Sequence, residues 1–234
     1  MCVILVPTER HPTKEELIDA ENQNPHGAGI AWRDKNGTMN YRKAINARTV
    51  MQIIEREKPQ IPYIVHFRIA SVGAVCKKLT HPFPVNHSVS LKQKWQGKSP
   101  LLFHNGTWRD WKTTLLPFSG NKDFPAGGLD DWSDSRAIAY LAHKTNRGIF
   151  RFIDEKVAIL EKNGVVNMHG KWEKQDTIWY SNTYHIKTYT THWKGHQKSV
   201  IWDKDDKKQD TIWDREWLEY ENQKVKDSMG GSLV

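Results

Sequence analysis

Met1-Cys2-Val3-Ile4-Leu5-Val6 opens the chain, and the other motifs of the sequence are interpreted around it. The apolar run that begins at Val3 predicts a buried strand, and a small residue at position 2 favours removal of the initiator methionine. Cys2 then carries a thiol and a free α-amine. An α-amine has an unperturbed pKa of roughly 8, so it can take the thiol proton near neutral pH. Cys2 is either a nucleophile with its own base or a small residue that opens a buried strand.

The composition is that of a folded protein. Its 234 residues are 38% hydrophobic and 26% charged, enough for one good-sized domain with a core, or one domain with an appendage. No apolar run approaches the ~20 residues of a membrane span, and the start lacks the order of a signal peptide. Cys2 and Cys76 are too few for a disulfide framework. We therefore expect a cytoplasmic protein with no membrane partner.

The charge and the histidines point to no specific ligand. The net charge is +8, but Lys and Arg are spread along the whole length without a recognition-helix or zinc signature, which argues against nucleic acid as the primary partner. Eleven His are scattered without ligand spacing. We expect neither a metal site nor a cofactor.

Capping signals predict three helices. Thr13-Lys14-Glu15-Glu16 has the Ser/Thr-x-x-Glu pattern of a capping box, and Asn24-Pro25 ends the helix that follows. A second helix is expected over residues 49–58, and a third follows Ser133 and is closed by Gly148. Beyond Tyr189 no sustained period remains, so the sequence predicts a domain over residues 1–189 and a tail rich in Trp, Lys and Asp over residues 190–234.

Apolar runs predict the strands. Residues 27–32 and 38–44 are expected to pair as a hairpin, with Asn36-Gly37 as a two-residue turn. Two further strands are expected at residues 62–68 and 100–106. A β-meander is expected over the second half of the domain, with strands at residues 149–153, 157–160, 165–168 and 177–180.

Polar side chains stand at the ends of these elements, and each has a structural and a functional interpretation. Arg68 follows an apolar strand, where it is either an edge charge or an anion ligand. Asn105-Gly106 is either a turn or a pair of donors. Asp134 lies in the first turn of a helix, where the helix dipole alone favours a carboxylate.

Taken together, these motifs resemble those of a class II glutamine amidotransferase, the glutaminase domain with an N-terminal nucleophile, in a compact form similar to versions carried by bacteriophages. The resemblance is carried, in this order along the chain, by Met1-Cys2, Gly27-Ala28-Gly29-Ile30-Ala31, His66-Phe67-Arg68-Ile69-Ala70-Ser71-Val72-Gly73, His81-Pro82, Phe103-His104-Asn105-Gly106 and Ser133-Asp134-Ser135. It implies an α+β fold, a four-layer α/β/β/α sandwich with two antiparallel sheets.

The resemblance also implies a reaction. The Cys2 thiolate attacks the side-chain amide of glutamine, and the Asn105 side chain and the Gly106 N–H stabilise the oxyanion. Arg68 binds the substrate carboxylate and Asp134 its ammonium group. Ser71 and His81 match family positions that line the pocket. Ammonia leaves, and water hydrolyses the thioester to glutamate.

Departures from the family pattern leave two other functions open. His26, Ile69 and Val72 replace residues found in many relatives and touch the nucleophile loop or the pocket wall. The stretch after residue 189 is too short for a synthase domain, so a separate synthase or ligase protein is expected to handle the acceptor. The alternatives are a Cys-type amidohydrolase of another amide and a catalytically silent binding or regulatory protein.

Overall fold

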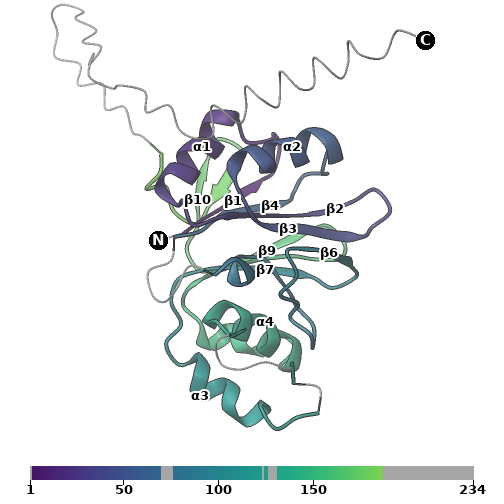
Figure 1. Cartoon of the computed structure of the whole chain (residues 1–234). Helices are drawn as coiled ribbons and strands as arrows, with labels where there is room; N and C mark the ends of the chain where they lie inside the picture. The colour runs from purple at the N-terminus through teal and green to yellow at the C-terminus, as the bar shows by residue number, and fades with distance from the viewer. Residues whose placement is uncertain (1, 70–75, 123, 126–130, 187–234) are drawn as a thin grey trace, which may run out of the picture. The chain divides into compact units, whose positions relative to one another are not determined.

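The fold is built on two antiparallel sheets (Figure 1). The computed structural model describes residues 2–69, 76–122, 124–125 and 131–186, which fall within one unit, Met1–Thr188. The predicted tail, residues 190–234, lies outside the described residues. No helix in the described part of the chain is long and apolar enough to cross a membrane.

The larger sheet has seven strands, in the order β10-β11-β1-β4-β2-β3-β6. Their bounds are β1 Val3–Pro7, β2 Ala28–Arg33, β3 Met39–Ile45, β4 Ile64–Phe67, β6 Lys94–Gly97, β10 Glu173–Gln175 and β11 Ile178–Tyr180. The smaller sheet has the order β5-β7-β8-β9, with β5 Phe83–Pro84, β7 Leu101–Asn105, β8 Lys156–Leu160 and β9 Val166–His169.

Strand β1 lies inside the larger sheet and is buried on both faces. It pairs with β4 through Val3 opposite Phe67, and with β11 through Leu5 opposite Tyr180. All five of its residues are buried. A strand covered on both sides needs apolar side chains at every position, which explains the continuous run that follows Cys2.

The helices begin where their caps predict. In α1, Lys14–Gln23, the Thr13 side chain accepts from the Glu16 N–H and the Glu16 carboxylate accepts from the Thr13 N–H. Helix α4, Asp134–Lys144, is capped by Ser133. Helix α2 spans Ala47–Glu57 and starts two residues earlier than predicted, because Asn46 caps it. The shorter helices are α3 Trp111–Leu115 and the 3-10 turns η1 Lys77–Leu79, η2 Leu116–Phe118 and η4 Gly148–Phe152.

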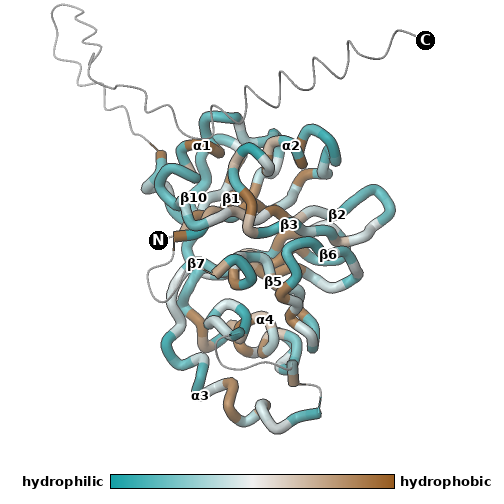
Figure 2. Tube along the Cα trace, viewed as in Figure 1, coloured by the Kyte–Doolittle hydropathy of each residue, from teal (hydrophilic) through white to brown (hydrophobic). Residues whose placement is uncertain are grey.

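Three hydrophobic clusters hold these elements together. Val3 and Leu5 pack with residues of α1 and α2, whereas Ile4 and Val6, on the other face of β1, pack with β7 and β8. The third cluster joins α4 to the smaller sheet. In Figure 2 the hydrophobic colour recurs along the strands, whereas α1 and α2 are largely hydrophilic. Burial of both faces of each sheet provides most of the hydrophobic stabilisation.

Four local predictions were wrong. The hairpin of β2 and β3 has a five-residue loop, since Arg33 pairs with Met39, and the Asp34 side chain accepts from the Asn36 and Thr38 N–H groups. The expected meander is split, because β8 and β9 belong to the smaller sheet whereas β10 and β11 belong to the larger one. Residues 149–153 form no strand, and Thr145 rather than Gly148 ends α4.

Candidate active site

Cys2 lies immediately before β1, and its thiol packs against the end of β4. The Sγ atom accepts from the Ile69 N–H and donates to the Ile69 carbonyl, both at 3.4 Å. Burial raises the pKa of the Cys2 thiol above its ordinary value, and the Ile69 N–H and the Arg68 charge act in the opposite direction. The thiol is half-buried and is held beside a cation that favours its thiolate form.

Two asparagines from different elements hold the Cys2 main chain. The side-chain amides of Asn105, at the end of β7, and Asn182, just after β11, both donate to the Cys2 carbonyl at 2.6 Å. Asn105 also donates to the Ser181 hydroxyl at 2.8 Å, and that hydroxyl accepts from the Ile4 N–H at 2.9 Å. Asn105 is therefore directly beside Cys2, as predicted from the sequence.

Sequence reasoning missed Ser181 and Asn182. The signal was present, because a Ser-Asn pair directly follows the apolar strand Ile178–Tyr180 in the same way that Asn105-Gly106 ends another apolar strand. Pairing of β11 with β1 then brings this strand end to the nucleophile, which no pattern within either strand reveals.

Gly106 occupies a position that excludes a side chain. A Cβ atom added there would lie 2.3 Å from Cγ of Glu155 and 3.3 Å from Nε2 of His104. The contact with Glu155 is far inside van der Waals distance and that with His104 is tight, so the backbone passes closely between these two residues. This packing alone is a structural reason for glycine at position 106.

Arg68 follows β4 and is fixed through its backbone. Its N–H donates to the Gly27 carbonyl and its carbonyl accepts from the His26 N–H, both at 2.9 Å. The guanidinium Nη1 donates to the Cys76 carbonyl at 3.2 Å. The side chain is half-buried, and its guanidinium has no carboxylate within ion-pair distance among the described residues. A cation with this arrangement suits an anionic ligand.

Asp134 is the first residue of α4 and is tied to the residues after β7. One carboxylate oxygen accepts from the Trp108 N–H at 3.1 Å, and the other accepts from the Ser135 N–H at 2.7 Å. The Nδ1 atom of His104 lies 2.9 Å from the Ser135 hydroxyl and 3.9 Å from Asp134. Helix α4 and strand β7 thus place Asp134 on the same side of the molecule as Asn105 and Gly106.

His81 is buried, and its ring lies close to those of two other buried histidines, His66 and His104. Its ring centroid is 4.3 Å from that of His66 and 6.5 Å from that of His104. Burial lowers the pKa of His66 to about 3 and that of His81 well below its usual range, so both rings are neutral near pH 7. Ser71 lies outside the described residues.

Comparison with known proteins gives information about the fold only. No family model matches the chain, and no curated protein matches it. The solved structures that match include a glutamine phosphoribosylpyrophosphate (PRPP) amidotransferase from B. subtilis, complexed with ADP and GMP, with a TM-score of 0.51 at 15% identity. They also include the allosteric regulatory enzyme of purine biosynthesis, with a TM-score of 0.50 at 15% identity.

Each alignment covers 79% of this chain and 42% of the solved chain. This chain therefore spans less than half the length of these two structures. The mixed α+β fold with two antiparallel sheets is shared with a PRPP amidotransferase, in agreement with the fold class that the sequence resemblance implies.

Proposed function

We propose that this chain is a glutaminase of the class II glutamine amidotransferase type, with Cys2 as its N-terminal nucleophile. The observation that carries the proposal is that the side-chain amides of Asn105 and Asn182 both donate a hydrogen bond to the Cys2 carbonyl. The fold in which they do so is shared with an amidotransferase. A cysteine that is only the residue before a buried strand does not need two side-chain hydrogen bonds to its carbonyl. The proposal includes the finer fold, a four-layer α/β/β/α sandwich.

The first step needs a free amine on Cys2. Once Met1 is removed, that amine takes the thiol proton, and the thiolate attacks the side-chain carbonyl carbon of glutamine. The oxyanion accepts from the Gly106 N–H and the Asn105 amide. Both Asn105 hydrogens already donate, to Cys2 and Ser181, so the oxyanion has to replace one of these acceptors.

The second step releases ammonia. The tetrahedral intermediate collapses, the carbon–nitrogen bond breaks, and the Cys2 ammonium gives its proton to the leaving group. This leaves a γ-glutamyl thioester on Cys2. Water then attacks the thioester, and glutamate leaves as the thiol is restored. These steps use side chains, the Gly106 backbone N–H, the amine and water.

Substrate recognition is assigned to the ends of β4 and the start of α4. The Arg68 guanidinium binds the glutamine carboxylate, and Asp134 binds its ammonium group. Each Asp134 oxygen accepts a backbone N–H, but a carboxylate has about four acceptor sites, which leaves room for a ligand. Ser71 and His81 complete the pocket in this proposal.

The ammonia acceptor is proposed to be handled by a separate synthase or ligase protein that contacts residues 190–234. Truncation after Thr188, the end of the unit that contains the described residues, tests this assignment. Glutamine hydrolysis is expected to survive while co-purification of the partner is lost. Unfolding of the truncated protein would show that the tail belongs to the domain.

A substrate panel tests the reaction class. Ammonia release is measured with glutamine, asparagine and Nα-acetylglutamine, and Cys2→Ala provides the baseline. Because Asp134 is assigned to the ammonium group, acetylation is expected to lower kcat/KM by at least about 100-fold. Equal rates on acetylglutamine would identify an amidohydrolase of another amide, and no release above the baseline would identify a silent binding protein.

A further inference from the structure

A polar cavity lies apart from the proposed catalytic residues. Its volume is about 290 Å³, close to the lower end of the range for small-molecule sites. One wall comes from the segment after β1 and from α1, and the other from the β10–β11 turn and the residues up to Ile186. Three carboxylates and one guanidinium line it, although the whole chain carries a net charge of +8.

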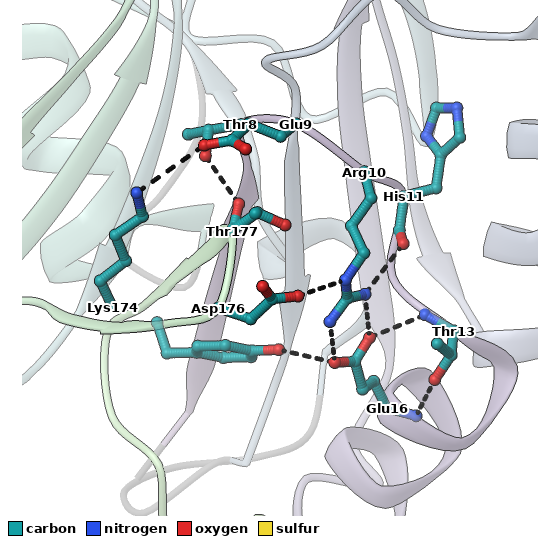
Figure 3. A network of polar contacts seen from close by, with 10 residues as sticks. Thr8, Glu9, Arg10, His11, Thr13, Glu16, Lys174, Asp176 and Thr177 are labelled. Carbon is teal, nitrogen blue, oxygen red and sulfur yellow. Dashed lines mark hydrogen bonds and ion pairs between the residues drawn. The ribbon is translucent and has the colours of Figure 1, made fainter.

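Arg10 occupies the centre of the charged network drawn in Figure 3. Its guanidinium donates to both oxygens of Glu16, at 2.7 and 2.9 Å, and to Asp176 at 2.8 Å. The single positive charge of Arg10 is thus shared between two carboxylates, those of Glu16 and Asp176. The third carboxylate, Asp19, has no hydrogen bond or ion pair within the described ranges, so the lining keeps an excess of negative charge.

His185 provides a second and independent sign of a ligand. Its side chain lines the cavity and is only 4% exposed, yet neither ring nitrogen has a hydrogen-bond partner within residues 2–186 where they are described. Its ring lies 5.3 Å from that of Tyr180. Burial lowers the pKa of His185, although Asp19 and Glu16 act in the opposite direction. A neutral ring offers one donor and one acceptor. Two buried nitrogens without hydrogen bonds lower the free energy of unfolding, which a ligand that bonded to them would offset.

We propose that this cavity binds a small organic cation through a primary ammonium group. An ammonium group carries three donors, which match the free Asp19 carboxylate, the acceptor nitrogen of His185 and the amide oxygen of Gln175. Tyr180 also lines the cavity. A metal ion fits less well, because no group of three or more His, Cys, Asp or Glu in the described part of the chain could hold one.

The cavity adjoins the segment that supports Cys2. Tyr180 and His185 line it, whereas Ser181 and Asn182, between them, hold Asn105 and the Cys2 carbonyl. The inference does not depend on the proposed glutaminase reaction, because it concerns binding alone.

Calorimetric titration of the full-length protein with putrescine tests the proposal, at about 0.15 M salt to suppress non-specific attraction. One-to-one saturable binding is expected, with none for the neutral analogue 1,4-butanediol. Asp19→Asn should weaken putrescine binding by about 10- to 100-fold, the effect of one charge-assisted hydrogen bond. Glu15→Gln, which removes an exposed charge from the same helix, is the matched control and should leave binding unchanged.

His185→Phe keeps a ring against Tyr180 but removes both nitrogens, so it provides a second test if Asp19→Asn does not fold. It should weaken putrescine binding while the thermal melting temperature stays close to that of the wild type. The proposal is overturned if wild-type protein shows no saturable binding, if butanediol binds equally well, or if Asp19→Asn binds as tightly as Glu15→Gln. Saturable magnesium binding in place of putrescine binding would also overturn it.

Discussion

Asn105 combines two tasks in one side chain, and the structure shows the first directly. It donates to the Cys2 carbonyl and to Ser181, so it fixes the nucleophile through the main chain. The second task, donation to an oxyanion, is part of the proposed function. Asn182 also donates to the Cys2 carbonyl, and the proposed function assigns it no part in stabilising the oxyanion. Comparison of the two residues therefore separates positioning from stabilisation of the oxyanion.

Asn105→Ala is expected to lower kcat for glutamine hydrolysis by roughly 100- to 1000-fold, since it removes an oxyanion donor. Asn182→Ala should lower kcat less, because the oxyanion keeps both donors. Steady-state glutamate release measures both effects, and Asn36→Ala, in the exposed β2–β3 loop, is the control. Equal losses in Asn105→Ala and Asn182→Ala would show that Asn105 only positions Cys2.

At the scale of elements, close backbone contacts locate the segment that carries His81. A Cβ atom on Gly29, in β2, would lie 1.9 Å from the His81 carbonyl oxygen, so only glycine allows this approach. From the sequence alone, the two glycines at residues 27 and 29 indicate either a sharp bend or a close approach of the backbone. Its partner was not predictable, because it comes from a segment more than fifty residues further along the chain.

Gly29→Ala is expected to destabilise the fold by about 3 kcal/mol or more, because the new methyl group meets rigid backbone rather than a side chain that can move. Gly120→Ala, where a Cβ atom has no neighbour within 4 Å, is the matched control and should change stability by less than about 0.5 kcal/mol. Urea unfolding of both variants measures the difference. Equal stability would mean that the His81 segment moves freely away from β2.

The elements differ in how far sequence alone predicts them. The Thr13 capping box and the Ser133 cap fix their helices through local hydrogen bonds, and both were predicted correctly. Residues 149–153 were predicted as a strand from a short apolar run, but Thr145 accepts from the Gly148 and Ile149 N–H groups and starts a 3-10 turn. The division of β8–β9 and β10–β11 between sheets depends on distant pairing, which local patterns do not encode.

The same distinction applies to the candidate site. Cys2, Asn105 and Gly106 were singled out because each adjoins an apolar run, and the structure brings the Asn105 amide to the Cys2 carbonyl through β7 and β1. Ser181 and Asn182 stand at an equivalent strand end but escaped notice, because the motif that the family resemblance supplies does not extend to them. The catalytic and binding roles remain proposals for all of the predicted residues: Cys2, Asn105, Gly106, Arg68, Ser71, His81 and Asp134.

For the molecule as a whole, the buried histidines predict a dependence of stability on pH. The pKa of His66 falls from 6.5 to about 3 on folding, so unfolding takes up a proton between these values. The stability that neutral His66 contributes is complete above pH 6.5 and is lost as the pH falls towards 3. His66→Leu should therefore flatten the decline of unfolding free energy by up to about 1.4 kcal/mol per pH unit.

Urea unfolding at several pH values between 4 and 7 measures this slope, and His87→Leu, at an exposed position, is the control. The wild type and the control should lose stability together as the pH falls, whereas His66→Leu should lose less. An unchanged slope in His66→Leu would mean that His66 is not kept neutral by burial.

Catalysis by Cys2 requires a free α-amine, and a paired measurement decides whether the active protein has one. Intact mass and glutamate release are determined on the same purified sample, with Cys2→Ala as the comparison. We expect a chain lighter by one methionine residue, glutamate release from glutamine, and loss of that release in folded Cys2→Ala. Full activity in a chain that keeps Met1, or undiminished activity in Cys2→Ala, would contradict this mechanism.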